Sequence, residues 1–216
     1  MINNSLDTFN FWKGKKVFIT GHTGFKGSWL CQWLILNGSI ITGYGLDTKE
    51  EKDLFNQLNL ESKIYHHIND IRDYQSLKAA IDSCQPDIIF HLAAQPLVID
   101  SYLKPKYTWE TNVMGTINLL DIVKNLSNRC SVVLISTDKV YQNTERNIAY
   151  TENSKLGGHD PYSASKAAME IAISSWIKSF CGTGDNQTPY LSIATARAGN
   201  VIGGGDWASN RIIPDS

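Results

Sequence analysis

The chain has 216 residues, 42% of them hydrophobic, and a formal net charge of −1 at pH 7. That length suffices for one well-filled α/β core. The near balance of 20 Lys and Arg against 21 Asp and Glu excludes the basic surface typical of nucleic-acid binding, and no basic amphipathic stretch or long apolar run points to a membrane. We therefore expect a single domain over residues 1–216 with small-molecule partners. Residues 1–5 lack a basic region followed by an apolar core, which predicts a cytoplasmic protein.

Cysteine and histidine are placed in ways that do not predict a metal site. The four cysteines are spread about fifty residues apart without a Cys-x-x-Cys pair, so we expect reduced, mostly buried thiols: Cys31, Cys84, Cys130 and Cys181. His66 and His67 are adjacent on a predicted strand and therefore point to opposite faces, where they cannot both serve one metal.

The first predicted element is a strand over residues 17–20, which runs into an apolar helix over residues 28–36. The link contains Gly21, Gly24 and Gly27 at intervals of three. Glycine permits a tight turn, close approach of main-chain N–H groups to a pyrophosphate, and close helix-on-strand packing. The phosphate charge would lie at the helix N-terminus. This Gly-x-x-Gly-x-x-Gly spacing resembles the extended branch of the short-chain dehydrogenase/reductase superfamily; a strand-to-helix turn without a ligand is the alternative.

The next segment carries features of an adenosine site. A second strand is predicted over residues 39–45, and Asp47 lies about 20 residues past the last turn glycine, where a carboxylate accepts from a ribose hydroxyl and favours NAD over NADP. A solvated loop residue is the equal alternative for Asp47. A third strand is predicted within residues 63–73, and in the extended short-chain family an Asp-Ile pair at this place contacts adenine. Asp70 and Ile71 match that pair.

Helix and strand continue to alternate along the chain. We predict a helix over residues 74–84, a strand over 87–95 that ends in small residues, a long amphipathic helix from Thr111, and a buried strand over 131–136. A last strand is predicted over 190–197. The alternation implies a doubly wound parallel sheet, Rossmann-like, with ligands at the carboxyl ends of its strands.

A tyrosine and a lysine with the right spacing follow the buried strand that ends near Thr137. Asp160 as N-cap and Pro161 as first helical residue predict a helix that places Tyr162 and Lys166 on one face. A tyrosine that takes a proton at neutral pH needs its pKa lowered from about 10 to near 7, which corresponds to about 4 kcal/mol. A neighbouring ammonium and a nicotinamide cation would stabilise the phenolate. The Tyr-x-x-x-Lys pattern is common by chance, so its position after the glycine turn gives it weight.

Several segments together closely resemble the CDP-glucose 4,6-dehydratases, a family of the extended short-chain superfamily. The resemblance covers nearly the whole chain from Phe11 and rests on five segments: residues 11–15, 21–30, 138–139, 158–162 and 197–207. Related sugar-nucleotide dehydratases carry Asp-Glu after the threonine, whereas the CDP-specific family carries the Asp138-Lys139 found here. That pair discriminates best among the relatives.

The resemblance implies an NAD-dependent hydro-lyase that converts CDP-glucose, or a related nucleotide sugar, to the 4-keto-6-deoxy sugar in deoxysugar and O-antigen biosynthesis. Tyr162 would remove the C4 hydroxyl proton, helped by Lys166 and Thr137, while hydride passes to NAD. A base would then remove the C5 proton, and water would leave C6 with Asp138 as the acid. The hydride would return to C6.

The resemblance and the motifs also give a set of binding residues. The predicted cofactor site comprises residues from the turn, the strand ends and the catalytic helix: Gly21, Thr23, Gly24, Phe25, Lys26, Gly27, Asp47, Asp70, Ile71, Leu92, Ala93, Ala94, Tyr162 and Lys166. The predicted substrate site has four members: Gln95, Asn200, Trp207 and Arg211. A ligand-free glycine loop is the alternative for residues 198–207, and no metal is expected.

Lys139 stands where the family's carboxylate base would be, and its role stays open. An unshifted lysine is neutral about 0.04% of the time at pH 7, a penalty of about 4.6 kcal/mol. Either nearby cations lower its pKa, or it acts through the C4 enolate or a water. Adjacent strand residues face opposite ways, so Asp138 and Lys139 share a site only if the regular strand ends near Thr137. An epimerase or dehydrogenase of the same fold, or a non-catalytic NAD-binding module, are the rival functions.

Two further expectations concern assembly and length. The resemblance and the apolar run within residues 162–178 predict a homodimer through this helix and the helix near residues 112–123. The family continues through a further substrate-binding region that residues 1–216 do not contain. We therefore expect the chain as given to bind NAD with little turnover, because a hexose without its full site lacks positioning that contributes about 7–11 kcal/mol.

Overall fold

The structure is a computed structural model that describes residues 10–48, 50–145, 147 and 149–208. Its centre is one six-stranded sheet in which every neighbouring pair of strands is parallel. The strand order is β3-β2-β1-β4-β5-β6, and the strands are β1 (Lys16–Thr20), β2 (Ile40–Gly45), β3 (Tyr65–Ile68), β4 (Ile88–His91), β5 (Cys130–Ile135) and β6 (Leu191–Ala196). The order reverses between β1 and β4, which creates the crevice where doubly wound sheets bind ligands. The predicted doubly wound parallel sheet is confirmed.

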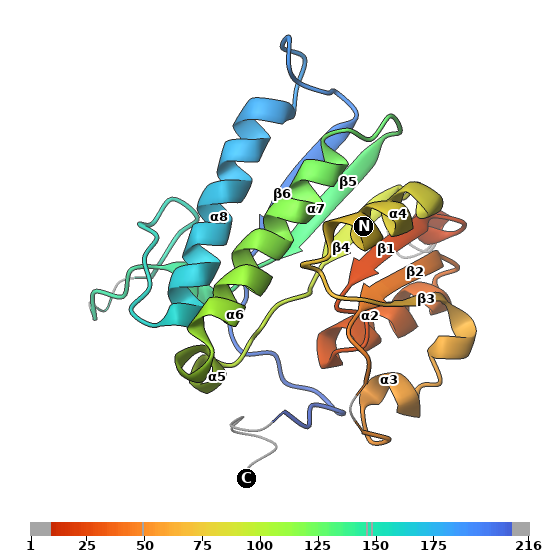
Figure 1. Cartoon of the computed structure of the whole chain (residues 1–216), viewed down its shortest axis with the longest axis horizontal. Coiled ribbons are helices and arrows are strands. Elements are labelled where there is room, and N and C mark those ends of the chain that lie inside the picture. The colour runs from red at the N-terminus through yellow and green to blue at the C-terminus, as the bar shows by residue number, and fades with distance from the viewer. Residues whose placement is uncertain (1–9, 49, 146, 148, 209–216) are drawn as a thin grey trace, which may run out of the picture.

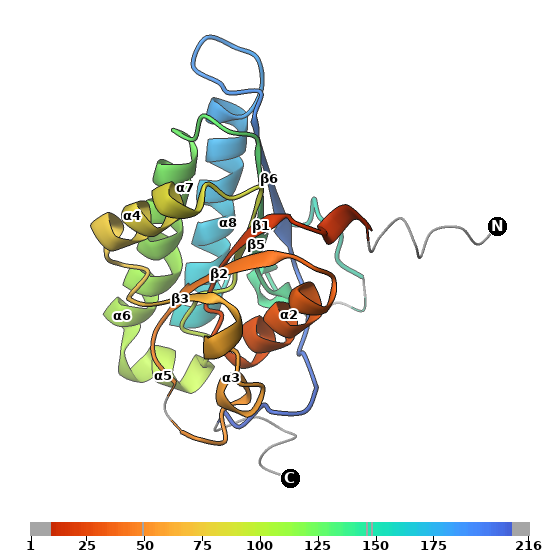
Figure 2. The ribbon, with the colours of Figure 1, turned by 90° about the vertical axis from the view of Figure 1, so that its right-hand side faces the viewer.

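Helices cover the two faces of the sheet unequally (Figures 1 and 2). On one face lie α4 (Tyr74–Cys84), α7 (Gly115–Val123) and α8 (Pro161–Phe180), and on the other lies α2 (Phe25–Leu36). The shorter elements connect these layers: α3 (Leu54–Gln57), α5 (Val98–Leu103), α6 (Pro105–Trp109), the π-helical turn η2 (Glu110–Met114), and the 3-10 turns η1 (Glu61–Lys63) and η3 (Asp138–Val140). α6, η2 and α7 follow one another directly in the chain.

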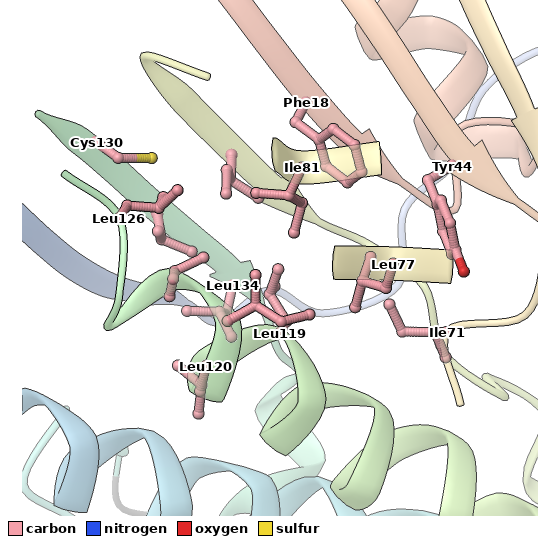
Figure 3. Packing of buried hydrophobic residues seen from close by; sticks show 14 of the residues in the cluster. Phe18, Tyr44, Ile71, Leu77, Ile81, Leu119, Leu120, Leu126, Cys130 and Leu134 are labelled. Carbon is pink, nitrogen blue, oxygen red and sulfur yellow. The ribbon is translucent and has the colours of Figure 1, made fainter. Parts of the chain in front are cut away.

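Two buried clusters hold the layers together, one on each face of the sheet. Between the sheet and α4, α7 and α8, Phe18, Leu77, Leu119 and Leu134 are fully buried (Figure 3). Between the sheet and α2 and α3 lies a smaller cluster of buried residues: Val17, Ile19, Cys31, Leu34, Ile41, Phe55, Leu60 and Ile88. Each Å² of apolar surface removed from water contributes about 25–30 cal/mol to stability, so such clusters are the main stabilising contribution in a fold of this size.

All four cysteines are free thiols, as predicted. Cys31 lies in the cluster beside α2, and Cys130 lies in the cluster on the opposite face of the sheet. Burial raises the pKa of each of these two thiols to about 12, so neither forms the reactive thiolate at neutral pH.

The boundaries of several elements differ from the prediction for local reasons. α2 begins at Phe25 rather than at 28, because Gly24 already acts as N-cap and its carbonyl accepts the Ser28 N–H at 2.8 Å. The helix expected from Thr111 begins earlier, at Pro105, whose fixed φ suits a first helical turn. β4 ends at His91: the Leu92 N–H is shared between the Thr20 carbonyl and the Thr20 hydroxyl, and the Ala93 N–H donates to that hydroxyl.

The last two strands present one face that no helix covers among the described residues. Ser131 of β5 and Ser192, Ala194 and Ala196 of β6 are exposed, and the parallel register aligns Ser131 with Ser192 on that face. α8 packs against β6 from the opposite face. The exposed side chains of β6 on this face are small, and Val133 and Ile135 of β5 beside them are half-buried.

Candidate active site

One cavity of about 270 Å³ lies at the carboxyl ends of the strands, where the strand order reverses. It brings together segments far apart in the chain: the glycine turn after β1, the ends of β2 and β3, the loop after β4, the π-helical turn, the end of β5 and the first turns of α8. Every residue predicted for the cofactor lines this cavity except Asp47. Asp47 is exposed, and its carboxylate accepts the neighbouring Thr48 N–H at 2.8 Å.

The glycine turn meets the cavity with an uncapped helix end. Gly24 is the N-cap of α2 and offers no side-chain hydrogen bond to the first turn, which leaves main-chain N–H groups available to an anion. A Cβ on Gly27 would lie 2.2 Å from the Gly21 carbonyl oxygen, and a Cβ on Gly21 would lie 2.7 Å from the Ala93 nitrogen. Only glycine permits this close packing, and the resulting cradle has the shape and polarity that a pyrophosphate requires.

A buried histidine ties the turn to the loop after β4. His91 is fully buried, with Nδ1 2.8 Å from the Thr20 hydroxyl and Nε2 3.0 Å from the Thr116 hydroxyl. The Thr20 hydroxyl in turn accepts the N–H groups of Leu92 and Ala93, at 3.2 and 3.1 Å. Desolvation, with a smaller contribution from Lys166, lowers the pKa of His91 to about 3, so the ring is neutral at pH 7. This network fixes two walls of the cavity against each other.

A network of charged side chains surrounds Asp70 where it lines the cavity. Arg72 donates from Nε and Nη2 to the Asp70 carboxylate, with the shortest contact 2.7 Å, and from Nη1 to Glu110 at 3.3 Å. Its guanidinium stacks 4.7 Å from the Tyr107 ring, which lines the cavity. These bonds hold the pKa of Asp70 below its usual value. Arg72 thereby joins the loop after β3 to the helix that precedes the π-helical turn.

Tyr162 and Lys166 line the same cavity. Asp160 caps α8 as predicted: its Oδ1 accepts the N–H groups of Tyr162 and Ser163, each at 3.0 Å. Lys166 is 4% exposed and donates from Nζ to the Ile135 carbonyl at 3.0 Å. Burial, then the nearby charge of Lys26, lowers the pKa of Lys166 to about 8. The ammonium is therefore mostly charged at pH 7 and lies where it stabilises a nearby anion.

A buried ion pair holds α8 against the end of β6. Arg197 donates from Nε and Nη2 to the Glu170 carboxylate at 2.8 and 3.0 Å, and Glu170 is 4% exposed. Burial opposes ionisation of Glu170, but the Arg197 guanidinium, together with the Ser136 and Thr195 hydroxyls, keeps the pKa of the carboxyl below its usual value. Arg197 also donates to the Tyr141 hydroxyl at 3.1 Å. Glu170 lies one turn beyond Lys166, so the pair anchors the helix that carries both predicted catalytic side chains.

Thr137, Asp138 and Lys139 lie together just beyond β5, outside the cavity lining. The regular strand ends at Ile135, and Asp138 and Lys139 are in a 3-10 turn, which meets the condition that the sequence analysis set for a shared site. Thr137 donates to Asp138 Oδ1 at 3.1 Å, and Lys139 Nζ lies 3.6 Å from the same oxygen. The side chains of Asp138 and Lys139 are 53% and 44% exposed, and the charged group beside the Lys139 ammonium is the Asp138 carboxylate.

None of the three predicted substrate residues that the structure describes, Gln95, Asn200 and Trp207, lines the cavity. Gln95 is buried, and its side-chain amide bonds to the main chain of Leu97 and to the Thr108 hydroxyl, which turns it away from the cavity. Asn200 is exposed, and Trp207 is 52% exposed, with the Lys52 ammonium 5.9 Å from its ring centroid. Arg211 lies outside the described residues.

Eight residues that line the cavity were not predicted from the sequence. These are Gly45, Leu46, Asn69, Pro96, Tyr107, Thr111, Ile135 and Ser136. Thr111 is the most informative, because its hydroxyl is buried without a hydrogen-bond partner while the residue lines the cavity. Such an orphaned donor and acceptor is costly unless a ligand or water meets it. Its position within the π-helical turn, a feature frequent at functional sites, could not be read from the sequence.

Comparison with known proteins shows which family the chain belongs to. The model of the GDP-mannose 4,6-dehydratase family matches residues 18–181, which include the glycine turn, Tyr162 and Lys166. The chain belongs to the GDP-mannose 4,6-dehydratase family. Within this dehydratase family the chain is 50% identical over 206 residues to the CDP-glucose 4,6-dehydratase of Salmonella typhimurium. That alignment covers 95% of this chain and 57% of the relative, and it confirms the resemblance seen in the sequence.

Other relatives of this dehydratase-family chain are more distant. The CDP-paratose 2-epimerase of Salmonella typhi is 30% identical over 181 residues, covering 76% of this chain and 54% of its own length. The chain thus spans little more than half of the curated relatives it matches. Among solved structures, the epimerase Mth375 of Methanothermobacter thermautotrophicus has a TM-score of 0.80 at 24% identity, covering 97% of this chain and 59% of its own. The dTDP-glucose 4,6-dehydratase of Bacillus anthracis, in complex with NAD, has a TM-score of 0.74 at 23% identity, covering 92% and 58%. These two share the fold.

Neither a metal centre nor a membrane segment is present in the part of the chain that the structure describes. There, no three His, Cys, Asp or Glu side chains gather closely enough to hold a metal ion. None of the helices in the same residues is both long enough and apolar enough to cross a bilayer. His66, which was not expected to bind a metal, contacts His22.

Proposed function

We propose that this chain carries the NAD site and the oxidising residues of a nucleotide-sugar 4,6-dehydratase, with CDP-glucose as substrate. The observation that carries the proposal is one cavity lined both by the glycine turn that forms the pyrophosphate cradle and by Tyr162 and Lys166. Oxidation of an alcohol by NAD needs these two features within the length of one dinucleotide. The identity of the nucleotide is supported by the 50% identity to a CDP-glucose 4,6-dehydratase and by the Asp138-Lys139 pair.

The residues present fit a bound NAD. The pyrophosphate would meet the uncapped N-terminus of α2, and the adenine would lie by Asp70 and Ile71. The Thr111 hydroxyl is a buried polar group at the cavity wall without a hydrogen-bond partner within the protein, so a ligand could bond to it. When bound, NAD would accept hydride from C4 of the sugar and return it to C6.

The first proton transfer belongs to Tyr162. Its phenolate takes the proton of the C4 hydroxyl as the C4–H bond gives up its hydride, and the C4 ketone forms. The charged Lys166, fixed by the Ile135 carbonyl, favours that phenolate electrostatically. Thr137, at the end of β5, supplies a hydroxyl for the same C4 oxygen once the substrate is in place.

The second half of the reaction is an elimination followed by reduction. The ketone acidifies C5–H, whose proton passes to a base, and the C6–O bond breaks as Asp138 gives its proton to the departing water. Hydride held by the reduced cofactor would then supply the new C6–H bond, and a proton would return to C5. Asp138 and Lys139 share one 3-10 turn, and Lys139 Nζ lies 3.6 Å from Asp138 Oδ1. Transfer of one proton from the ammonium to the carboxylate would give Asp138 the proton that it donates to the leaving C6 oxygen.

Isothermal titration calorimetry of the 216-residue chain with NAD, and then with CDP-glucose, tests the binding part. We expect one NAD per chain. Turnover is tested in a chimera in which residues 1–216 replace the matching part of the Salmonella typhimurium dehydratase, with formation of the 4-keto sugar as readout. Tyr162→Phe should abolish C4 oxidation there while NAD still binds. A chimera that keeps its turnover with Phe at 162 would contradict the assignment.

Isotope labelling separates dehydration from the rival reaction on the same fold. In the chimera, turnover in deuterated water should place deuterium at C5 and remove the C6 oxygen. An epimerase or a simple dehydrogenase would keep the C6 oxygen, and that result would replace the proposal by the rival. A non-catalytic module would bind NAD and leave Tyr162 without effect on any product.

The predicted homodimer is part of the proposal. Trp109, Met114 and Ile171 are large apolar side chains that are 41%, 50% and 62% exposed along the outer side of α6, η2 and α8. Apolar groups gathered on one side of a helical layer are typical of an interface. Light scattering at micromolar concentration should give a dimer mass, and Ile171→Glu should give a monomer. Tyr190→Glu, at an exposed site just before β6, is the control that should leave the mass unchanged.

A further inference from the structure

A histidine of the glycine turn points away from the cavity and into the fold. His22 is fully buried beside β2, and its Nε2 lies 2.6 Å from Nδ1 of His66 on β3. The ring meets the Phe55 ring edge-on at 5.3 Å. His22 does not line the cavity, and no catalytic role has been assigned to it above.

The sheet is shaped to receive this ring. A Cβ on Gly43 would lie 2.3 Å from Cδ2 of His22, and a Cβ on Gly45 would lie 3.3 Å from its Nδ1. Gly43 is paired in register with His66 on the adjacent strand. The imidazole of His22 therefore lies across β2, over a residue that has no side chain, and reaches the third strand of the sheet.

The backbone of His22 is held from the opposite side. Its carbonyl accepts the Ser28 hydroxyl at 3.2 Å, and a Cβ on Gly27 would lie 2.7 Å from its Cα. The neighbouring Gly21 N–H donates to the Tyr44 carbonyl at 2.8 Å. Residue 22 is thus fixed by α2 through its main chain and by β2 and β3 through its side chain.

The contact between the two rings is a bond between neutral groups at pH 7. Burial, and then the neighbouring His66, lowers the pKa of His22 to about 4. The pKa of His66 is also lowered, chiefly by desolvation, against the raising effect of Glu61 and Asp47. One ring therefore donates N–H to the other, and the bond needs no counter-ion in this buried place.

We propose that His22 is a positioning residue for dinucleotide binding. Its side chain crosses β2 and bonds to His66, and this bond holds the pyrophosphate turn in its binding shape. The inference rests on the proposed function, since the turn matters only if it receives a pyrophosphate. Without the ring, residues 21–24 keep their attachment to α2 but lose their attachment to β3. The main-chain N–H groups of the cradle would then be less well aligned with the phosphates, and affinity would fall for ligands that contain them.

The test compares ligands with and without a pyrophosphate on folded protein. His22→Ala should weaken NAD and ADP binding about tenfold, roughly the factor that one net hydrogen bond carries, and leave adenosine binding within about twofold. His22→Gln, which keeps an N–H donor near the Nε2 position, should retain most of the affinity. His67→Ala, on the other face of β3, is the control and should change nothing. Circular dichroism at the assay temperature verifies that each variant is folded.

A second comparison removes any dependence on the folding of one variant. Gly43→Ala places a methyl group in the space of the His22 ring and should weaken NAD binding in the parent chain. In a His22→Ala background the same substitution should cost little, because the space is then empty. His66→Ala removes the same bond without substituting any residue of the turn, and it should weaken NAD binding like His22→Ala.

The outcomes separate this inference from the proposed function. If the parent chain binds neither NAD nor ADP, the proposed function fails and the inference falls with it. If the parent binds both and the His22, His66 and Gly43 variants bind them equally well, the inference alone is overturned. An equal loss of NAD and adenosine affinity would also overturn it, because a general loosening of the fold does not distinguish the phosphate site.

Discussion

The dinucleotide side of the molecule and the sugar side are built in different ways. Around the glycine turn, polar side chains such as Thr20, His91 and Lys166 are buried and bonded to one another or to main chain. Beyond β5, Asp138 and Lys139 are about half exposed and bonded chiefly to each other. On the first side, a change that affects binding also affects folding. On the second, side chains can change with little effect on the fold, so their chemistry can be tested separately.

The largest expected effect comes from breaking the buried ion pair under α8. Arg197→Met leaves the Glu170 carboxylate buried without its cation, and we expect the free energy of unfolding to fall by about 3–5 kcal/mol. Urea denaturation measures it. Lys78→Met removes one partner of the exposed Lys78–Asp82 pair on α4 and should cost no more than about 0.5 kcal/mol. Equal costs for the two substitutions would remove the distinction between buried and exposed regions.

The glycine turn gives the next effect. Gly27→Ala forces a methyl group to within 2.2 Å of the Gly21 carbonyl oxygen, so we expect a loss of about 1–3 kcal/mol in stability and more than about a hundredfold in NAD affinity. Calorimetry with NAD and thermal denaturation measure the two losses. Gly204→Ala is the matched control, because a Cβ there meets nothing within 4 Å. Unchanged NAD affinity in the Gly27 variant would show that the turn is not the phosphate site.

Acid should destabilise the dinucleotide side first. The folded-state pKa values of His22 and His91, about 4 and about 3, lie below the unfolded value of about 6.5. The part of the free energy of unfolding that depends on these neutral rings is therefore fully present above pH 6.5, and it is lost as the pH falls toward the folded-state pKa values. Between pH 8 and pH 5.5 we expect each histidine to lower the free energy of unfolding by about 1.4 kcal/mol, or about 3 kcal/mol for the two together. Urea denaturation at the two pH values measures this change. His22→Gln should remove about half of that dependence; a stability independent of pH over this range would contradict the prediction.

The smallest effect is expected on the sugar side. Asp138→Asn and Lys139→Met should each change the free energy of unfolding by less than about 0.5 kcal/mol, because both side chains are exposed and their mutual ion pair is weak in water. In the chimera described above, the same variants should lose elimination while C4 oxidation persists, seen as reduced cofactor absorbing near 340 nm. A large loss of stability would show that the two sides are not separable.

The sequence predicted the parts of the site that depend on local spacing. The glycine turn and the capped start of α8 are each marked by residue types within ten positions, namely the spaced glycines and the Asp160-Pro161 pair, so their presence could be predicted from local sequence. The contacts that escaped depend on the fold. Gln95 was expected to meet substrate, but Thr108, thirteen positions away, takes its amide. The bond between His22 and His66 joins positions 44 apart, and no local pattern announces it.

The two fully buried thiols offer a way to watch the layers of this protein open. Cys31 and Cys130 lie on opposite faces of the sheet, and neither reacts until its own face is exposed to solvent. Alkylation of each, resolved by mass spectrometry, would therefore report the opening rate of the α2 layer and of the α7–α8 layer separately in one native chain. If ligand binding slows alkylation of Cys31 much more than that of Cys130, the two layers are independent cooperative units, and the dinucleotide stabilises only one of them.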